Sequence, residues 1–140
     1  MTPVLSLRDY ALHYDTFTGP VRILDDISLD IARGEVLGLV GESGSAKSSL
    51  ANAVIRDLPG RVHDEHGAIK LTGEDITTLP QPALEALRGR RIAMVFQNAA
   101  TTLDPVQTLG DHLLETLGRH TKLDPTARRA RAIELLDMVG

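Results

Sequence analysis

The stretch Gly41-Glu42-Ser43-Gly44-Ser45-Ala46-Lys47-Ser48 decides the fold. It matches the phosphate-binding loop G-x-x-x-x-G-K-S/T at every fixed position except the sixth, where Ala46 stands in place of glycine. In such a loop the backbone N–H groups converge on phosphates, the lysine reaches the outer phosphates and the serine hydroxyl binds Mg²⁺. The stretch therefore predicts a nucleotide-phosphate site.

The segments on either side of this loop agree with that interpretation. Residues 35–40, Glu-Val-Leu-Gly-Leu-Val, form an apolar run of the length of a buried parallel strand. The helix expected from the lysine onward places Leu50, Ala53 and Val54 on one stripe. An ordinary Gly/Ser turn explains the glycines but not a lysine and a serine at this spacing, and the dinucleotide pattern G-x-G-x-x-G lacks its first pair of glycines.

The rest of the chain predicts further elements in a definite order. Two segments with alternating polarity, 4–14 and 21–31, indicate a hairpin. A short strand over 68–71, a helix over 80–87, a second core strand over 91–96 and helices from 109 and over 126–139 follow. Asp124 is the expected N-cap of the last helix, with Pro125 at its first position. We expect a hairpin and a parallel α/β core, followed by a helical annex.

Composition narrows the classes of partner and compartment. The 140 residues carry a net charge of −4 with two Phe, two Tyr and no Trp, which argues against nucleic acid as a partner. The chain has no cysteine, so it has neither disulfides nor thiolate metal sites, and a reducing compartment fits. No apolar stretch approaches the roughly 20 residues that cross a bilayer. A charged pair, Arg8-Asp9, interrupts the N-terminus before a signal-peptide core develops.

Two further stretches, Val95-Phe96-Gln97-Asn98 and Thr102-Leu103-Asp104-Pro105, complete a recognisable pattern with the loop. Together they resemble the ATP-binding subunit of ABC transporters, most closely the subfamily that energises oligopeptide, dipeptide and nickel import. That family commonly has G-E-S-G-S-G-K-S in the loop, then F-Q-D-P and S-L-N-P. The resemblance runs from about Leu5 to Gly140. It implies an α/β fold: a P-loop NTPase core with an N-terminal antiparallel β hairpin subdomain and the start of a helical subdomain, incomplete at the C-terminus. The β subdomain strands would lie over 1–34, the core with both nucleotide loops over 35–100 and the start of the helical subdomain over 101–140.

The resemblance also implies the ligands and the site residues. ATP and Mg²⁺ are the expected cofactors, with Lys47 and Gln97 in catalysis and Ser48 and Gln97 on the metal. Gln97 would contact Mg²⁺ and the attacking water and link the site to a transmembrane subunit; the alternative is a polar residue at a strand end. The nucleotide-binding residues are Tyr14, Gly41, Glu42, Ser43, Gly44, Ser45, Ala46, Lys47, Ser48 and Ser49. Tyr14 lies where the family stacks an aromatic ring on adenine; a half-buried strand residue is the alternative role, and Phe17 is a nearby rival.

By the same resemblance, the chain would couple ATP binding and hydrolysis to the import of peptide-like solutes. The expected partners are transmembrane permease subunits and a second nucleotide-binding subunit, in a homo- or heterodimer. The expected location is cytoplasmic, peripheral on the inner face of the cell membrane through those partners.

Two departures from the family pattern leave alternatives open. If the loop needs φ > 0 at Ala46, alanine costs on the order of 1–2 kcal/mol, enough to weaken nucleotide binding roughly tenfold. The signature L-S-G-G-Q and the apolar strand ending in Asp-Glu do not occur in these 140 residues, so ATP turnover by them alone is an open question. A non-catalytic nucleotide-binding remnant or regulatory module is the first alternative. A small P-loop kinase is the second; it fits the length better and the strand order worse.

The remaining polar clusters receive ordinary interpretations. Residues 63–66, His-Asp-Glu-His, lack the helical spacing of a zinc site and are expected in a solvated loop. The arginines near 88–91 and 128–131 are expected on solvent-facing surfaces. Leu135-Leu136-Asp137 is expected in a helix rather than at the end of a catalytic strand.

Overall fold

The computed structural model describes residues 2–98 and 102–140, which form two compact units, Met1–Ile92 and Ala93–Gly140. In the described residues, the first unit contains a sheet and helices α1 and α2, and the second unit contains helices α4 and α5. None of the helices in the described part of the chain combines the length and apolarity that crossing a bilayer requires.

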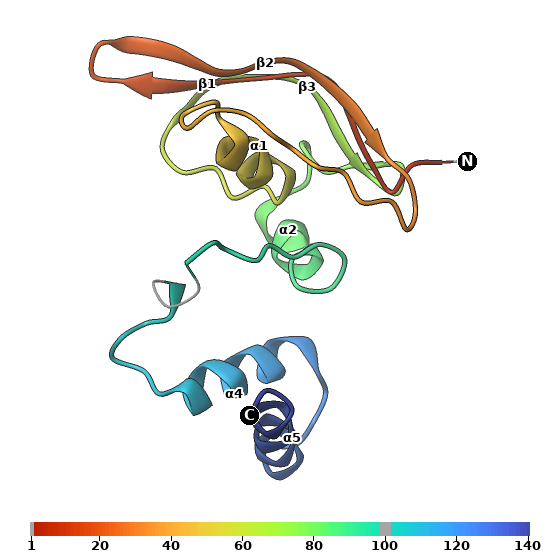
Figure 1. Ribbon diagram of the computed structural model, residues 1–140, viewed down its shortest axis with the longest axis vertical. Coiled ribbons are helices and arrows are strands. Elements are labelled where there is room, and N and C mark those ends of the chain that lie inside the picture. Colours follow the sequence, from red (N-terminus) through yellow and green to blue (C-terminus); the bar gives the residue numbers. More distant parts are fainter. Residues whose placement is uncertain (1, 99–101) are drawn as a thin grey trace. The chain divides into compact units, whose positions relative to one another are not determined.

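A four-stranded antiparallel sheet dominates the first unit, with strand order β2-β1-β3-β4 (Figure 1). The strands are β1 (Leu5–Thr16), β2 (Gly19–Ile31), β3 (Val62–Leu71) and β4 (Glu74–Asp75). The predicted hairpin is confirmed as β1 and β2. The predicted strand over 68–71 is confirmed as the end of β3, which starts six residues earlier because its polar first half pairs with the distant β1.

A β-bulge in β1 decides which side chains face the core. The β1–β2 register breaks between Leu7 and Tyr10, and Asp9 has a positive φ of 46°. Strict alternation from Leu7 would turn Tyr10 toward solvent, whereas both side chains are fully buried. The bulge therefore places Tyr10, Leu12 and, further along, Tyr14 on the core side of β1.

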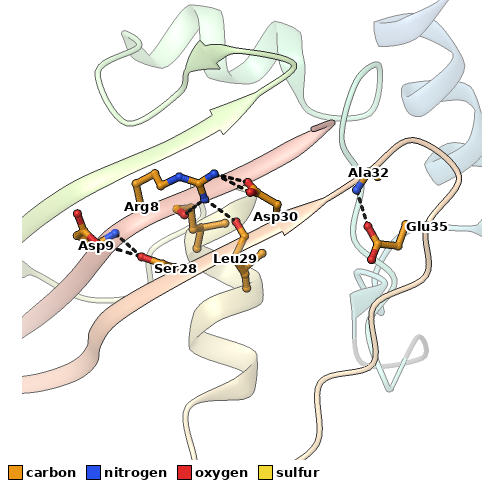
Figure 2. Close-up of polar contacts among 8 residues, drawn as sticks. Arg8, Asp9, Ser28, Leu29, Asp30, Ala32 and Glu35 are labelled. Carbon is orange, nitrogen blue, oxygen red and sulfur yellow. Dashed lines mark hydrogen bonds and ion pairs between the residues drawn. The ribbon is translucent and has the colours of Figure 1, made fainter. Parts of the chain in front are cut away.

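Polar contacts hold this bulge in place (Figure 2). The guanidinium of Arg8 donates to both carboxylate oxygens of Asp30, at 2.7 and 2.6 Å, and to two backbone carbonyls. The Asp9 N–H donates to Ser28 Oγ at 2.9 Å. On the other flank, Gly67 of β3 lies so close that an added Cβ would come within 2.4 Å of two β1 carbonyl oxygens. Only glycine fits beside the bulge.

Helix α1 (Lys47–Val54) lies against one face of the sheet (Figure 1). Its buried residues Leu50 and Ala53 join β1 and β3 side chains in the core of this unit. Helix α2 (Gln81–Leu87) adds Leu84 and Leu87 to the same core. Both helices were predicted at these positions, and each uses the apolar stripe that its sequence pattern shows.

The two predicted core strands are wrong. Within the described residues, neither 35–40 nor 91–96 forms a strand, and the only pairing in either segment is a bridge between Arg88 and Ile92. The side chains expected to be buried are exposed instead, Val36 at 96% and Val40 at 93%. An extended segment becomes a strand only when a neighbour accepts its hydrogen bonds, and β2-β1-β3-β4 leaves these segments outside the sheet.

The second unit contains helices α4 (Leu109–His120) and α5 (Pro125–Asp137), which pack against each other. Thr108 and Asp111 form a reciprocal capping box at the start of α4. Asp124 caps α5 by accepting from the N–H groups of Thr126 and Ala127 at 2.9 and 3.0 Å, with Pro125 next to it, as predicted. Residues 135–137 are helical as expected, and Asp137 is exposed.

Candidate phosphate-binding site

The loop over residues 41–48 turns into α1 through two residues in the left-handed backbone region. Gly44 has φ +83°, and Ala46, the N-cap residue of α1, has φ 59° and ψ 20°. The first turn of helix follows at once, with the Leu50 N–H donating to the Ala46 carbonyl at 2.9 Å. The condition that makes alanine costly at this position, a positive φ, is therefore met.

The opening glycine of the loop lies close to two side chains of the same loop. A Cβ added at Gly41 would meet Ser45 Oγ at 2.7 Å and lie 3.8 Å from Lys47 Nζ. Ser45 also folds back on the loop, its hydroxyl donating to the Glu42 carbonyl at 2.8 Å. The loop thus closes on itself, and a side chain at its first position would require the Ser45 hydroxyl to shift.

The Lys47 ammonium lies over this closed loop. It donates to the carbonyl oxygens of Gly41 at 2.8 Å and Glu42 at 2.6 Å, and to Ser45 Oγ at 3.0 Å. All three acceptors belong to the loop itself. A lysine has three donors, so this arrangement uses all of them and centres a positive charge on the loop.

The N-terminus of α1 completes the positive character of the site. No side chain caps this helix, and its first turn contains no acidic residue. The first N–H groups of a helix lack partners within the helix and carry the positive end of its dipole. Because α1 leaves these groups without a side-chain cap beside the Lys47 ammonium, the loop offers an anion both fixed N–H donors and a full positive charge.

Ser48 and Ser49 follow the lysine in the first turn of α1, Ser48 exposed and Ser49 half-buried. The described residues contain no group of three or more His, Asp or Glu side chains able to hold a metal ion. A single exposed hydroxyl suits Mg²⁺ only when phosphate oxygens and waters supply the other ligands. The loop therefore fits a magnesium ion brought by a phosphate chain.

The two candidate base-stacking rings are in different environments. Tyr14 is half-buried on β1 and packs against the core, and its buried hydroxyl has no hydrogen-bond partner among the described residues. Burial raises its pKa, and the negative charge of Glu65 adds to the effect. Phe17, in the turn between β1 and β2, is fully exposed. Stacking by Tyr14 stays a prediction.

A buried polar triad that the sequence analysis missed lies at the far end of α1. Arg56, just beyond the helix, forms a bidentate ion pair with Glu65 of β3, and the hydroxyl of Tyr10 donates to the same carboxylate at 2.7 Å. The Arg56 and Glu65 side chains are only 10% and 20% exposed. Burial alone would lower the pKa of Arg56, but the hydrogen bond and the negative charge of Glu65 more than offset burial, so the Arg56 pKa is raised. The pKa of Tyr10 is also raised, by burial and by the hydrogen bond to Glu65.

These contacts correct two sequence expectations. Residues 63–66 lie in β3 rather than in a solvated loop, because they pair with β1. The local sequence does not show this pairing, since β1 is distant along the chain. Arg88 is half-buried rather than solvent-facing: its Nε donates to the Ile55 carbonyl at 2.9 Å, and its Nη2 donates to the Arg56 carbonyl. An arginine just past the C-terminus of a helix opposes the negative end of the helix dipole.

The predicted site residues fall into two groups. The loop, the start of α1 and Tyr14 all lie in the first unit, around a shared core. Gln97 is exposed and lies in the second unit. Its role beside the loop stays a prediction.

Comparison with known sequences identifies relatives over nearly the whole chain. The family model described as ABC transporter matches residues 24–140. The probable D,D-dipeptide transport ATP-binding protein DdpD of Escherichia coli is 40% identical over 136 residues, which cover 96% of this chain and 42% of that protein. The oligopeptide transport ATP-binding protein OppD of Bacillus subtilis is 33% identical, covering 100% of this chain and 39% of that protein. The chain therefore spans about two fifths of the length of these relatives.

Solved structures show the same fold. The ATP-binding cassette MJ0796, in a dimeric post-hydrolysis state bound to ADP and Pi, aligns with a TM-score of 0.74 at 23% identity. The alignment covers 96% of this chain and 56% of the cassette. The expected α/β P-loop fold class is thereby confirmed. With a family match over most of its length and a phosphate-binding loop at the start of α1, the chain belongs to the ABC transporter family.

Proposed function

We propose that this chain binds Mg-ATP as the N-terminal portion of an ATP-binding subunit of a peptide importer. The observation that carries the proposal is the loop over 41–48, where Lys47 lies over closed backbone beside an uncapped helix N-terminus. When a triphosphate binds, its phosphate oxygens would take the place of the three loop oxygens that Lys47 now contacts. The first N–H groups of α1 would bind the same anion, and Mg²⁺ bound to it, with Ser48 as a ligand, would neutralise part of its charge.

We infer roles for two residues outside the loop. Tyr14, which packs against the core that α1 shares, would stack its ring on adenine. Gln97 would contact Mg²⁺ and the attacking water, as the family resemblance implies. Both assignments rest on matching positions in the family pattern.

The transport role is proposed from the relatives, which are named as dipeptide and oligopeptide transport ATP-binding proteins. In that role ATP binding and hydrolysis drive import of peptide-like solutes through permease subunits, with a second nucleotide-binding subunit as partner. The site would then lie on the cytoplasmic face of a membrane. The transport role is tested by co-purifying the chain with such permease subunits from cells that express both proteins. Failure of the two to co-purify under conditions in which the chain retains ATP would contradict the transport role.

Nucleotide binding is tested by titration calorimetry of the full chain with MgATP. Lys47→Ala should abolish the heat of binding, because it removes the positive charge centred on the loop. Lys70→Ala is the matched control, since Lys70 is an exposed lysine on β3 away from the loop. Wild-type protein that is folded and shows no binding at millimolar MgATP would refute the proposal, as would equal binding by Lys47→Ala.

A non-catalytic nucleotide-binding module is the second candidate, and the left-handed conformation of Ala46 favours it. Measuring phosphate release by the assembled transporter with and without Ala46→Gly separates the two. A protein that binds ATP and stays inert in both forms is a binding module. The small kinase considered from length alone is set aside, because the chain belongs to the ABC transporter family.

A further inference from the structure

The buried triad of Arg56, Glu65 and Tyr10 connects two parts of the proposed nucleotide site. Arg56 follows α1, whose opposite end carries the phosphate-binding loop. Glu65 lies on β3 opposite Leu12 of β1, and Tyr10 lies on β1 itself. One carboxylate therefore ties the end of α1 to two neighbouring strands.

Arg56 is held firmly enough to act as an anchor. Its backbone is in the left-handed region at φ 60°, and its N–H donates to the Ala53 carbonyl at 3.0 Å. Its side chain forms a two-pronged bond with Glu65 and a longer one, at 3.5 Å, with the Thr77 carbonyl. Arg88 binds the Ile55 and Arg56 carbonyls from the other side. The end of α1 is thus fixed from two directions.

Tyr10 and Tyr14 share the core side of β1 because the bulge at Asp9 precedes both. An eight-residue helix is a rigid rod of about 12 Å, so fixing its far end also fixes the loop at its near end. Apolar contacts through Leu50 and Ala53 have no preferred direction, whereas a forked ion pair sets both direction and distance. The triad therefore sets the position of the loop relative to the strand that carries Tyr14.

We propose that Arg56, Glu65 and Tyr10 are positioning residues that hold the phosphate-binding loop and Tyr14 at the spacing of a nucleoside triphosphate. This rests on the proposed function, with Tyr14 as the base-stacking ring. The triad then contributes to binding only when a ligand engages the loop and Tyr14 together. A bare triphosphate chain engages the loop alone and gains nothing from the spacing.

The test compares MgATP with magnesium tripolyphosphate on the full chain by titration calorimetry. Glu65→Gln weakens the fork while keeping an oxygen acceptor, and it should weaken MgATP about tenfold while leaving tripolyphosphate unchanged. Tyr10→Phe keeps the shape of the ring and removes only the hydrogen bond to Glu65. It should therefore lower the ratio of MgATP affinity to tripolyphosphate affinity, by less than Glu65→Gln does. Glu74→Gln is the control, because it removes an exposed ion pair with Arg91 on β4, a strand of the same sheet that does not pair with β1. It should leave both affinities unchanged.

A double-mutant cycle distinguishes positioning from general stability. In a Tyr14→Ala background, Glu65→Gln should have no further effect on MgATP, because the second contact of the ligand is already lost. The inference is overturned, while nucleotide binding itself stands, if Glu65→Gln leaves the ratio of MgATP affinity to tripolyphosphate affinity unchanged, including by weakening both ligands equally. It is also overturned if the effects of Glu65→Gln and Tyr14→Ala on MgATP affinity are additive. If Glu65→Gln does not fold, Tyr10→Phe decides by the same ratio. Wild-type protein that binds neither ligand overturns the proposed function, and this inference with it.

Discussion

Replacing Ala46 by glycine tests the conformation of the phosphate-binding loop. Ala46 has φ 59° and ψ 20°, a region that costs an L-residue with a Cβ about 1–2 kcal/mol. Glycine removes that cost but adds about 0.4–1 kcal/mol of conformational freedom to the unfolded chain. The Ala46 methyl is half-buried against the core, and losing it costs about 0.4 kcal/mol, half the value of a buried methylene. The net change in the free energy of unfolding lies between a loss of about 0.4 kcal/mol and a gain of about 1.2 kcal/mol.

The matched control is Ala51→Gly, because Ala51 is half-buried in the middle of α1, where φ is helical. This change has no strain to relieve and should lower the free energy of unfolding by about 1 kcal/mol. Urea unfolding followed by circular dichroism should therefore separate the two variants by about 1–2 kcal/mol. If Ala46→Gly destabilises the chain as much as Ala51→Gly, the left-handed conformation of Ala46 is refuted.

Three further predictions concern other parts of the chain. Gly67→Ala should destabilise the first unit by about 3 kcal/mol in urea unfolding, because its Cβ would meet backbone oxygens at 2.4 Å. The control Gly60→Ala, at φ +93° with open space around it, should cost only about 1–2 kcal/mol, and equal losses would contradict the steric argument. Hydrogen bonds from Thr108 hold the pKa of Asp111 below its usual 3.8, so the stability that they add is present above pH 3.8 and is lost as the pH falls through the lowered pKa. Over that pH range the helical ellipticity at 222 nm should decrease in the wild type, and it should decrease less in Asp111→Asn. Phe17→Ser should change the unfolding free energy by less than about 0.5 kcal/mol and leave MgATP affinity unchanged, and weaker binding would mean that Phe17 rather than Tyr14 stacks on the base.

Features that depend on neighbouring residues were predictable from the sequence. Asp124 and Pro125 mark the start of α5 because capping involves N–H groups only two and three residues away. The loop and α1 were found because their signal lies in consecutive residues. The same holds for the hairpin, whose two strands are joined by a short turn.

Features that depend on distant partners were not predictable in this way. The run over 35–40 has strand-like composition, but a strand also needs a neighbour, and composition does not supply one. The first half of β3 was assigned to a loop because its polar residues conceal a pairing with β1. Arg56 and Glu65 are nine positions apart and carry ordinary charges, so no local pattern indicates that they meet in a buried triad.

The exposed apolar run over 36–40 has a practical consequence for anyone who handles the protein. Val36 and Val40 face water almost completely, beside backbone that no described strand pairs with. Exposed apolar segments of this kind favour association between copies of a chain. Sample concentration will thus govern how long a preparation stays monodisperse, and light scattering on a dilution series should show particle size rising with protein load.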